Sequence, residues 1–260
     1  MRSSVIRDIN LDPGQYLGRP RVEELLARAA PAPDAPVSSL YLRPAAATGG
    51  ASPFLAAAGP EGRAWADILA RVGEPALESD TGVVGLRAGG RALVIVPPFP
   101  VRQDRLVPAW DPASLLELLA TQYLIGVVLL RLGRFSVAVY QGERLRSSKT
   151  DARYVKGRHR AGGSSQRRFE RIREGQMRRI YDKTCEAVAA QFGPYARQLD
   201  YLVLGGERIT LNNFMKVCPY LEQFRGITLG RRLNIRDPKR DTLDAVGSLL
   251  YQSRVYLLEG

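Results

Sequence analysis

The chain has 260 residues, of which 45% are hydrophobic, and these values are typical of a folded protein with one large domain or two ordinary ones. Its formal net charge of +12 favours polyanionic partners such as nucleic acid. The longest nearly continuous apolar run, at 123–130, is too short to span a bilayer, and the first residues lack the apolar segment of a signal peptide. We therefore expect a cytoplasmic protein without a membrane partner.

The first part of the chain mixes short periodic segments with residues that favour loops. The pattern predicts a helix at 21–30, a strand at 37–42, a mobile loop at 44–60 and a hairpin of 82–88 with 91–96. Gly89-Gly90 supplies the hairpin turn, and the prolines at 97–100 end it. We expect residues 1–110 to form a small α/β N-terminal domain.

The second part shows longer strand-like runs. Asp111 and Pro112 predict the start of a helix, as N-cap and first helical residue. The pattern then predicts strands at 125–132, 135–141 and 143–148, a long helix at 165–192, a strand at 201–206, a helix at 209–217, the segment 226–235, and a helix from Asp237-Pro238 onward. This order predicts an α/β fold for residues 111–260, with a mixed sheet flanked by helices.

The predicted long helix has an apolar side and a basic side. The residues expected on the apolar side, packed in the core, are Phe169, Ile172, Met177, Ile180, Cys185, Val188 and Phe192. The residues expected to point elsewhere are Arg168, Arg171, Arg178 and Arg179. Much of the positive charge lies here, because the stretch from Arg144 to Arg179 carries thirteen Arg and Lys against three acidic residues.

The two cysteines, Cys185 and Cys218, lie far apart and outside any CxxC motif. They predict neither a disulfide framework nor a four-ligand zinc site. We expect them to be core residues or inert thiols in a reducing compartment. The carboxylates Glu207, Asp237 and Asp241 lie near turns and helix starts, where capping explains them without metal. No metal or cofactor is expected.

The segment GGSSQ, residues 162–166, precedes the long helix inside the basic stretch. Gly162 and Gly163 allow the main chain to approach a ligand closely, and Ser164 or Ser165 can cap the helix. The unpaired N–H groups of a helix start suit a phosphate or a developing oxyanion, and Gln166 adds an amide. Such a loop can hold water and stabilise a tetrahedral intermediate at an ester, while the flanking arginines hold an RNA backbone.

The order of strands, basic loop, GGSSQ, arginine-rich helix and buried strand resembles the central domain of the eukaryotic and archaeal class-one peptide release factors. Their loop carries Gly-Gly-Gln, whereas GGSSQ is closer to the VLRF group, the Vms-type release-factor-like peptidyl-tRNA hydrolases. The resemblance covers roughly residues 120–235 and includes the helix sequence QRRFERIREGQMRRIYDKTCEAVAAQF.

The resemblance implies hydrolysis of the ester between nascent peptide and tRNA in the peptidyl-transferase centre. Its catalytic residues would be Gln166, Gly162, Gly163, Ser164 and Ser165. Its RNA-binding residues would be Lys156, Arg158, His159, Arg160, Arg167, Arg168 and Arg171. The implied partners are peptidyl-tRNA and the rRNA of the large ribosomal subunit, with a monomer when free. No codon-reading motif is present, which favours rescue of stalled ribosomes over stop-codon decoding.

The same residues are also compatible with other interpretations. GGSSQ alone is typical of a flexible connector, and a charged helix is usually a solvated face. The rescue protein pelota is similar in its central domain but lacks the glutamine loop, so the chain could be a non-catalytic ribosome-binding module. A nuclease that cleaves tRNA is a further alternative, although this loop lacks the clustered carboxylates of metal-dependent nucleases.

Overall fold

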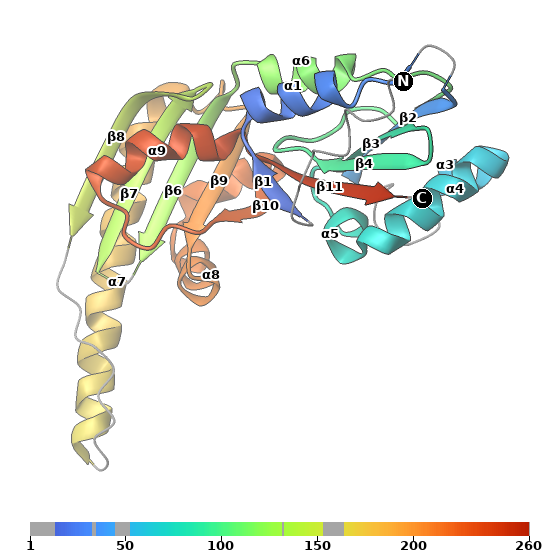
Figure 1. The fold of residues 1–260 in the computed structure, drawn as a ribbon. Helices are drawn as coiled ribbons and strands as arrows, with labels where there is room; N and C mark the ends of the chain where they lie inside the picture. Colours follow the sequence, from blue (N-terminus) through green and yellow to red (C-terminus); the bar gives the residue numbers. More distant parts are fainter. Residues whose placement is uncertain (1–13, 33–34, 45–52, 132, 153–163, 260) are drawn as a thin grey trace. The chain divides into compact units, whose positions relative to one another are not determined.

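A computed structural model describes residues 14–32, 35–44, 53–131, 133–152 and 164–259 (Figure 1). The chain forms two compact units. One takes in the residues up to Thr121 and those from Ser248 onward, and the other runs from Gln122 to Gly247. The division therefore falls later than the expected boundary at 110/111, and the last strand of the chain belongs to the first unit. No helix among the described residues is long and apolar enough to cross a membrane.

The first unit contains a six-stranded sheet in which all neighbouring strands are antiparallel. Its order is β1 (Gln15–Leu17), β11 (Ser253–Glu259), β4 (Arg91–Val96), β3 (Val83–Ala88), β2 (Val37–Leu42) and β5 (Arg105–Val107). The predicted strand at 37–42 is confirmed. The predicted hairpin is also confirmed, since Ala88 pairs with Arg91 across the Gly89-Gly90 turn.

Helices cover both faces of this sheet. The helices of the first unit are α1 (Arg19–Arg28), α3 (Pro53–Ala57), α4 (Gly59–Val72), α5 (Glu74–Leu77) and α6 (Ala113–Ala120). Helices α1 and α6 pack on one face, and α3, α4 and α5 pack on the other, around the buried Trp65. The sequence prediction of a loop through residue 60 was wrong for 53–60, because Leu55 and the residues of α4 contribute apolar side chains to the core.

The predicted start of α6 was wrong by one residue, because Pro112 is the N-cap residue in place of Asp111. The helix begins at Ala113, and the Asp111 carboxylate accepts a hydrogen bond of 3.1 Å from the Ala113 N–H. The predicted helix near the N-terminus is confirmed as α1.

The second unit contains the mixed sheet that the sequence predicts. Its order is β10 (Thr228–Leu233), β9 (Tyr201–Gly206), β6 (Leu124–Arg131), β7 (Arg134–Gln141) and β8 (Arg144–Ala152). Strands β10, β9 and β6 run parallel, whereas β6, β7 and β8 form an antiparallel meander. Its helices are α7 (Ser164–Phe192), α8 (Arg208–Val217), α9 (Arg240–Leu250) and the 3-10 segments η1 (Gly193–Tyr195) and η2 (Pro219–Ile227).

Alternate residues of β7 face opposite sides of this sheet. Phe135, Val137 and Val139 join the core formed with α7 and α8. On the other side, the Tyr140 hydroxyl donates a hydrogen bond of 2.7 Å to the carbonyl of Leu243 in α9. The sheet is therefore covered on both faces, and the first turns of α7 project beyond it (Figure 1).

Ile172 corrects one prediction about α7. The apolar pattern placed it in the core, but 37% of this residue is exposed. Figure 1 shows that the first turns of α7 extend past the sheet, and the apolar periodicity of the helix continues toward them. Met177, Ile180, Cys185, Val188 and Phe192 do contact the core, as predicted.

The two cysteines correct another prediction, because Cys185 and Cys218 form a disulfide with a Cα–Cα distance of 5.4 Å. Cys185 lies in α7, and Cys218 directly follows α8. The two cysteines are 33 residues apart in the sequence, and this spacing alone does not predict that they are in contact. The contact arises because both helices pack on the same face of the sheet. The bond ties the long helix to its neighbour.

We expect the double variant Cys185→Ala/Cys218→Ala to lower the free energy of unfolding by about 2–4 kcal/mol, since the disulfide restricts the unfolded chain. Urea unfolding followed by circular dichroism measures the change. A reductant should destabilise the wild-type protein to a similar extent and leave the variant unaffected. Equal midpoints for wild type and variant without reductant would contradict a stabilising bond.

Candidate functional site

The predicted site lies where β8 leads, through residues 153–163, into α7. The structure describes β8 up to Ala152 and α7 from Ser164, so the predicted long helix is confirmed. Ser164, Ser165 and Gln166 are the first three residues of α7. Their backbone N–H groups therefore belong to the first turn, whose donors have no partner within the helix. These donors lie at the positive end of the helix dipole.

Several predicted site residues fall outside the described part of the chain. Those that lie there entirely are Gly162, Gly163, Lys156, Arg158, His159 and Arg160. For residues 164–170, which include Gln166, Arg167 and Arg168, the structure describes the helical backbone alone, so the predicted serine cap is outside it too. Arg171 is described and exposed. The catalytic and RNA-binding roles of all these residues stay predictions.

The part of α7 that crosses the sheet is firmly held. Phe192 is fully buried, and its ring packs against Phe224 with the centroids 5.8 Å apart. A Cβ atom at Gly126 of β6 would lie 3.0 Å from the Phe192 ring, so this glycine lets helix and strand approach closely. Burial raises the pKa of the Tyr181 hydroxyl, which hydrogen-bonds Asn213 of α8. Together with the disulfide, these contacts fix the direction in which the start of α7 projects.

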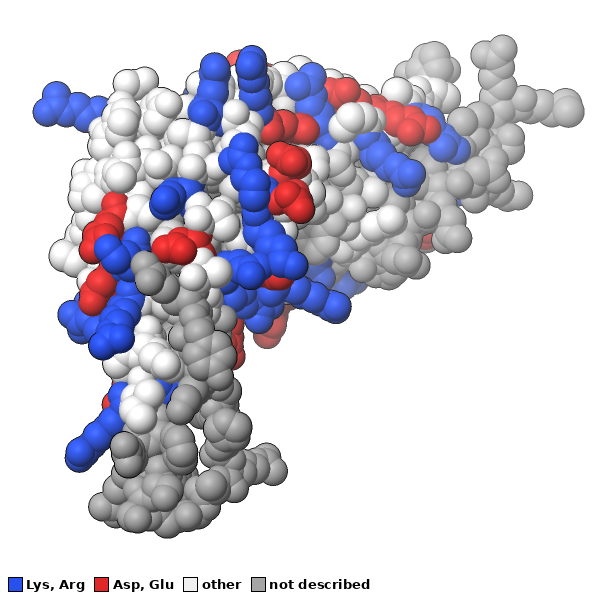
Figure 2. All heavy atoms as spheres, turned by 90° about the vertical axis from the view of Figure 1, so that its left-hand side faces the viewer, with Lys and Arg blue, Asp and Glu red and all other residues white. Residues whose placement is uncertain are grey.

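Basic side chains lie around the place where α7 begins to project beyond the sheet (Figure 2). Arg171 and Arg179 are exposed and have no ion-pair partner among the described residues, whereas Arg178 pairs with Asp182 at 3.3 Å. The described side chains thus form a positively charged surface next to the predicted loop. Such a surface favours the binding of phosphate groups.

Capping was predicted for three carboxylates, but the Glu207 side chain makes no capping hydrogen bond to α8. Glu207 is the N-cap residue of α8, and its carboxylate accepts a hydrogen bond of 3.2 Å from the Thr210 hydroxyl. Asp237 contacts Lys239 at 2.9 Å and Arg134 at 2.8 Å, and these cations hold the pKa of its carboxyl below the usual range. Asp241 lies in the first turn of α9. Among the described residues, no group of His, Cys, Asp and Glu has the arrangement of a metal site.

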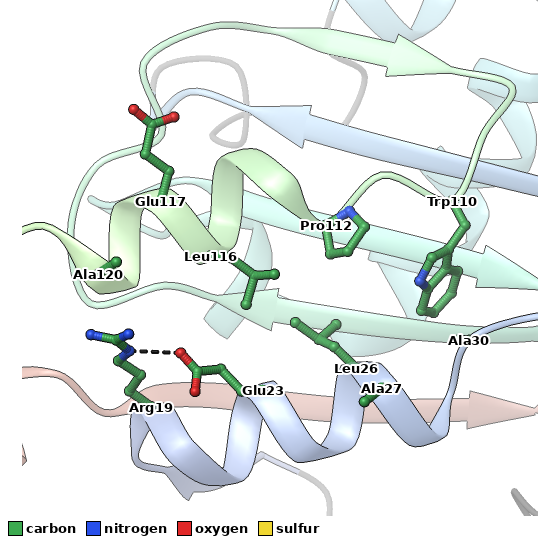
Figure 3. A pocket seen from close by; sticks show the side chains of 10 residues that line it. All are labelled: Arg19, Glu23, Leu26, Ala27, Ala30, Trp110, Pro112, Leu116, Glu117 and Ala120. Atoms are coloured by element: carbon green, nitrogen blue, oxygen red, sulfur yellow. Dashed lines mark hydrogen bonds and ion pairs between the residues drawn. The ribbon is translucent and has the colours of Figure 1, made fainter.

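A separate groove of about 570 Å³ lies in the first unit between α1 and α6 (Figure 3). Leu26, Leu116 and Trp110 line it, and an ion pair of 2.7 Å between Arg19 and Glu23 lies at one end. None of the predicted site residues contributes to this groove, whose lining is mainly apolar.

The second unit thus combines a mixed sheet covered by helices with a long helix that begins within the GGSSQ segment. The family model described as "Actinobacteria/chloroflexi VLRF1 release factor" matches residues 123–256, and the chain belongs to this family. The predicted resemblance to the VLRF group is confirmed.

The chain is also similar to archaeal proteins named peptide chain release factor subunit 1. The protein of Archaeoglobus fulgidus is 33% identical over 104 residues, which is 40% of this chain and 25% of that protein. The protein of Methanopyrus kandleri is 32% identical over 129 residues, 48% of this chain and 31% of that protein. The similarity thus spans a third or less of these relatives.

Two solved structures are similar to larger parts of the chain at lower identity. The crystal structure of an archaeal translation termination factor matches 90% of this chain and 71% of its own, with 16% identity and a TM-score of 0.36. The mitochondrial localization core of Vms1 matches 68% of this chain and 75% of its own, with 14% identity and a TM-score of 0.40.

Proposed function

We propose that this protein is a ribosome-associated peptidyl-tRNA hydrolase that releases nascent chains from stalled ribosomes or large subunits without reading a stop codon. The observation that carries the proposal is the position of GGSSQ. Its last three residues open a long helix that projects beyond the sheet, in a chain of the VLRF1 release-factor family. A projecting helix start can enter a confined RNA site while the sheet stays outside.

In this reaction a water oxygen attacks the ester carbonyl carbon, the bond to the terminal ribose oxygen breaks, and that oxygen takes a proton. Gln166 would position the water, and N–H groups of the first helical turn would stabilise the negative charge of the intermediate. Gly162, Gly163, Ser164 and Ser165 would shape the loop around the ester. RNA groups of the ribosome would complete the site, so a general base from the protein is not required.

The protein would bind the ribosome through RNA contacts. The basic residues around the loop, from Lys156 to Arg171, would hold RNA phosphates, and the N-terminal domain would dock on the ribosome. We propose that the protein works in the cytoplasm, is a monomer when free, and needs no cofactor. Its partners would be peptidyl-tRNA and the rRNA of the large subunit.

The proposal is tested by incubating the full chain with large ribosomal subunits that carry labelled peptidyl-tRNA. We expect release of the peptide and a tRNA with an intact 3′ adenosine, because an ester hydrolase leaves the RNA chain whole. A tRNA shortened at its 3′ end would instead identify a nuclease. Tight binding without release would identify a non-catalytic docking protein.

A further inference from the structure

The carboxyl ends of three parallel strands meet at one edge of the second unit's sheet, which we call the carboxyl edge. Leu130 of β6 lies beside Gly206 of β9, and Leu233 ends β10 at the same level. Strand β8 ends there too, because Ala152 pairs with Arg134, the first residue of β7. The carboxyl edge is therefore the side of the sheet from which the chain leaves toward the predicted catalytic loop.

Three exposed arginines lie at or next to the strand ends of the carboxyl edge. Arg208 begins α8, Arg232 lies near the end of β10, and Arg236 follows that strand. All three are exposed, and none has a carboxylate within ion-pair distance among the residues that the structure describes. Ile209, next to Arg208, is 68% exposed, so the edge also offers an apolar contact for a ribose or base.

The carboxylates of this edge do not cancel the charge. Asp237 is shared by Arg134 and Lys239, and Glu207 accepts the hydrogen bond of a threonine hydroxyl. The carboxylate of Asp151, near the end of β8, accepts a hydrogen bond from the N–H of the next residue. The described cations at or next to these strand ends include Arg131, Arg134, Arg208, Arg231, Arg232, Arg236 and Lys239, and the described carboxylates include Asp151, Glu207 and Asp237. The cations outnumber the carboxylates, so the edge carries a net positive charge. The three exposed arginines have no ion-pair partner among the described residues.

We propose that the carboxyl edge binds the sugar-phosphate backbone of large-subunit rRNA through Arg208, Arg232 and Arg236. The choice of rRNA follows from distance. Ile180, a residue of α7 packed in the core, lies fourteen residues after Gln166, so the helical rise separates the two by about 20 Å. A surface of this sheet would thus contact RNA away from the ester, and arginines without carboxylate partners suit phosphates there. This inference rests on the proposed function for its ribosomal partner.

The test measures binding of the full chain to vacant large ribosomal subunits across a salt series. We expect Arg208→Gln/Arg232→Gln/Arg236→Gln to weaken binding at least about tenfold at low salt, since each lost phosphate contact removes a charge-assisted hydrogen bond. The slope of log affinity against log salt should fall by about 2–3, roughly one for each arginine.

The matched control is Arg144→Gln/Arg197→Gln/Arg225→Gln, which removes the same charge from the same unit. These three residues are exposed and lie at the opposite edge, at the start of β8, after η1 and within η2. The control should retain most of the affinity and the salt slope of the wild type. Equal losses in both triple variants would show a response to net charge alone and overturn the proposal.

Two further outcomes separate this inference from its alternatives. If the carboxyl-edge variant loses affinity only for subunits that carry peptidyl-tRNA, the edge contacts tRNA and the assignment to rRNA is wrong. At saturating subunits the same variant should release peptide at the wild-type rate, because Gln166 is unchanged. A wild-type protein that releases no peptide, yet still binds vacant subunits through this edge, would remove the proposed activity and leave the binding surface standing.

Discussion

Replacement of Gln166 by alanine should slow peptide release about 10²-fold or more, with binding to large subunits unchanged, because a donor aimed at the transition state contributes on this scale. Gln166 is the third residue of α7, in the turn whose N–H groups have no partner within the helix. The change removes the side-chain amide and keeps the helical backbone, since alanine favours a helix. Single-turnover release at saturating subunits isolates the chemical step from binding.

The control for this prediction is Gln223→Ala, which removes an exposed glutamine from η2 and should leave release unchanged. Release by Gln166→Ala at the wild-type rate would exclude the Gln166 side chain from the mechanism. The backbone N–H groups of the first turn would then be the remaining protein contribution, since they are present in both proteins.

The second unit was largely predictable because its strands are apolar and long. The runs that became β6, β7 and β9 are buried almost throughout, and α7 shows its helical period over most of its length. Ile172 shows the limit of this reasoning. Periodicity predicts which residues share a face of a helix, but the length of the sheet beneath decides where that face stops being buried.

The first unit was less predictable because several of its elements are short or unusual in composition. β1 and β5 have three residues each, too few for a periodic pattern. β11 escaped notice because it follows the predicted last helix, and its partners β1 and β4 lie far away in the sequence. The hydrophobic pattern within one segment does not predict which strands that segment will pair with.

One part of the candidate site could be predicted from the sequence, and another part could not. GGSSQ is a local motif, and the sequence alone placed it before a helix. The disulfide between Cys185 and Cys218, and the cluster of Arg208, Arg232 and Arg236, depend on contacts between separate elements. The cluster in particular requires the parallel pairing of β10 with β9, which brings the ends of both strands to one edge.

We expect Val255→Asp to unfold the first unit, because it would place a carboxylate in a fully buried position of a central strand. Val255 lies between Gln15 of β1 and Ile95 of β4 in the register. A buried charge without a partner should cost more than about 4 kcal/mol of unfolding free energy, a large part of the stability of a domain. Both tryptophans of the chain, Trp65 and Trp110, belong to this unit, so their fluorescence reports on it alone.

Trp65 is fully buried in the wild type, so unfolding should move the emission to longer wavelength in Val255→Asp. Glu259→Gln is the matched control, since it changes an exposed residue of the same strand and should leave the emission unchanged. If the Val255 variant kept wild-type emission and urea midpoint, β11 would not be a structural strand of this sheet. If instead the variant lost its tryptophan signal but still released peptide, the catalytic step would depend on the second unit alone, and the first unit would serve binding or regulation.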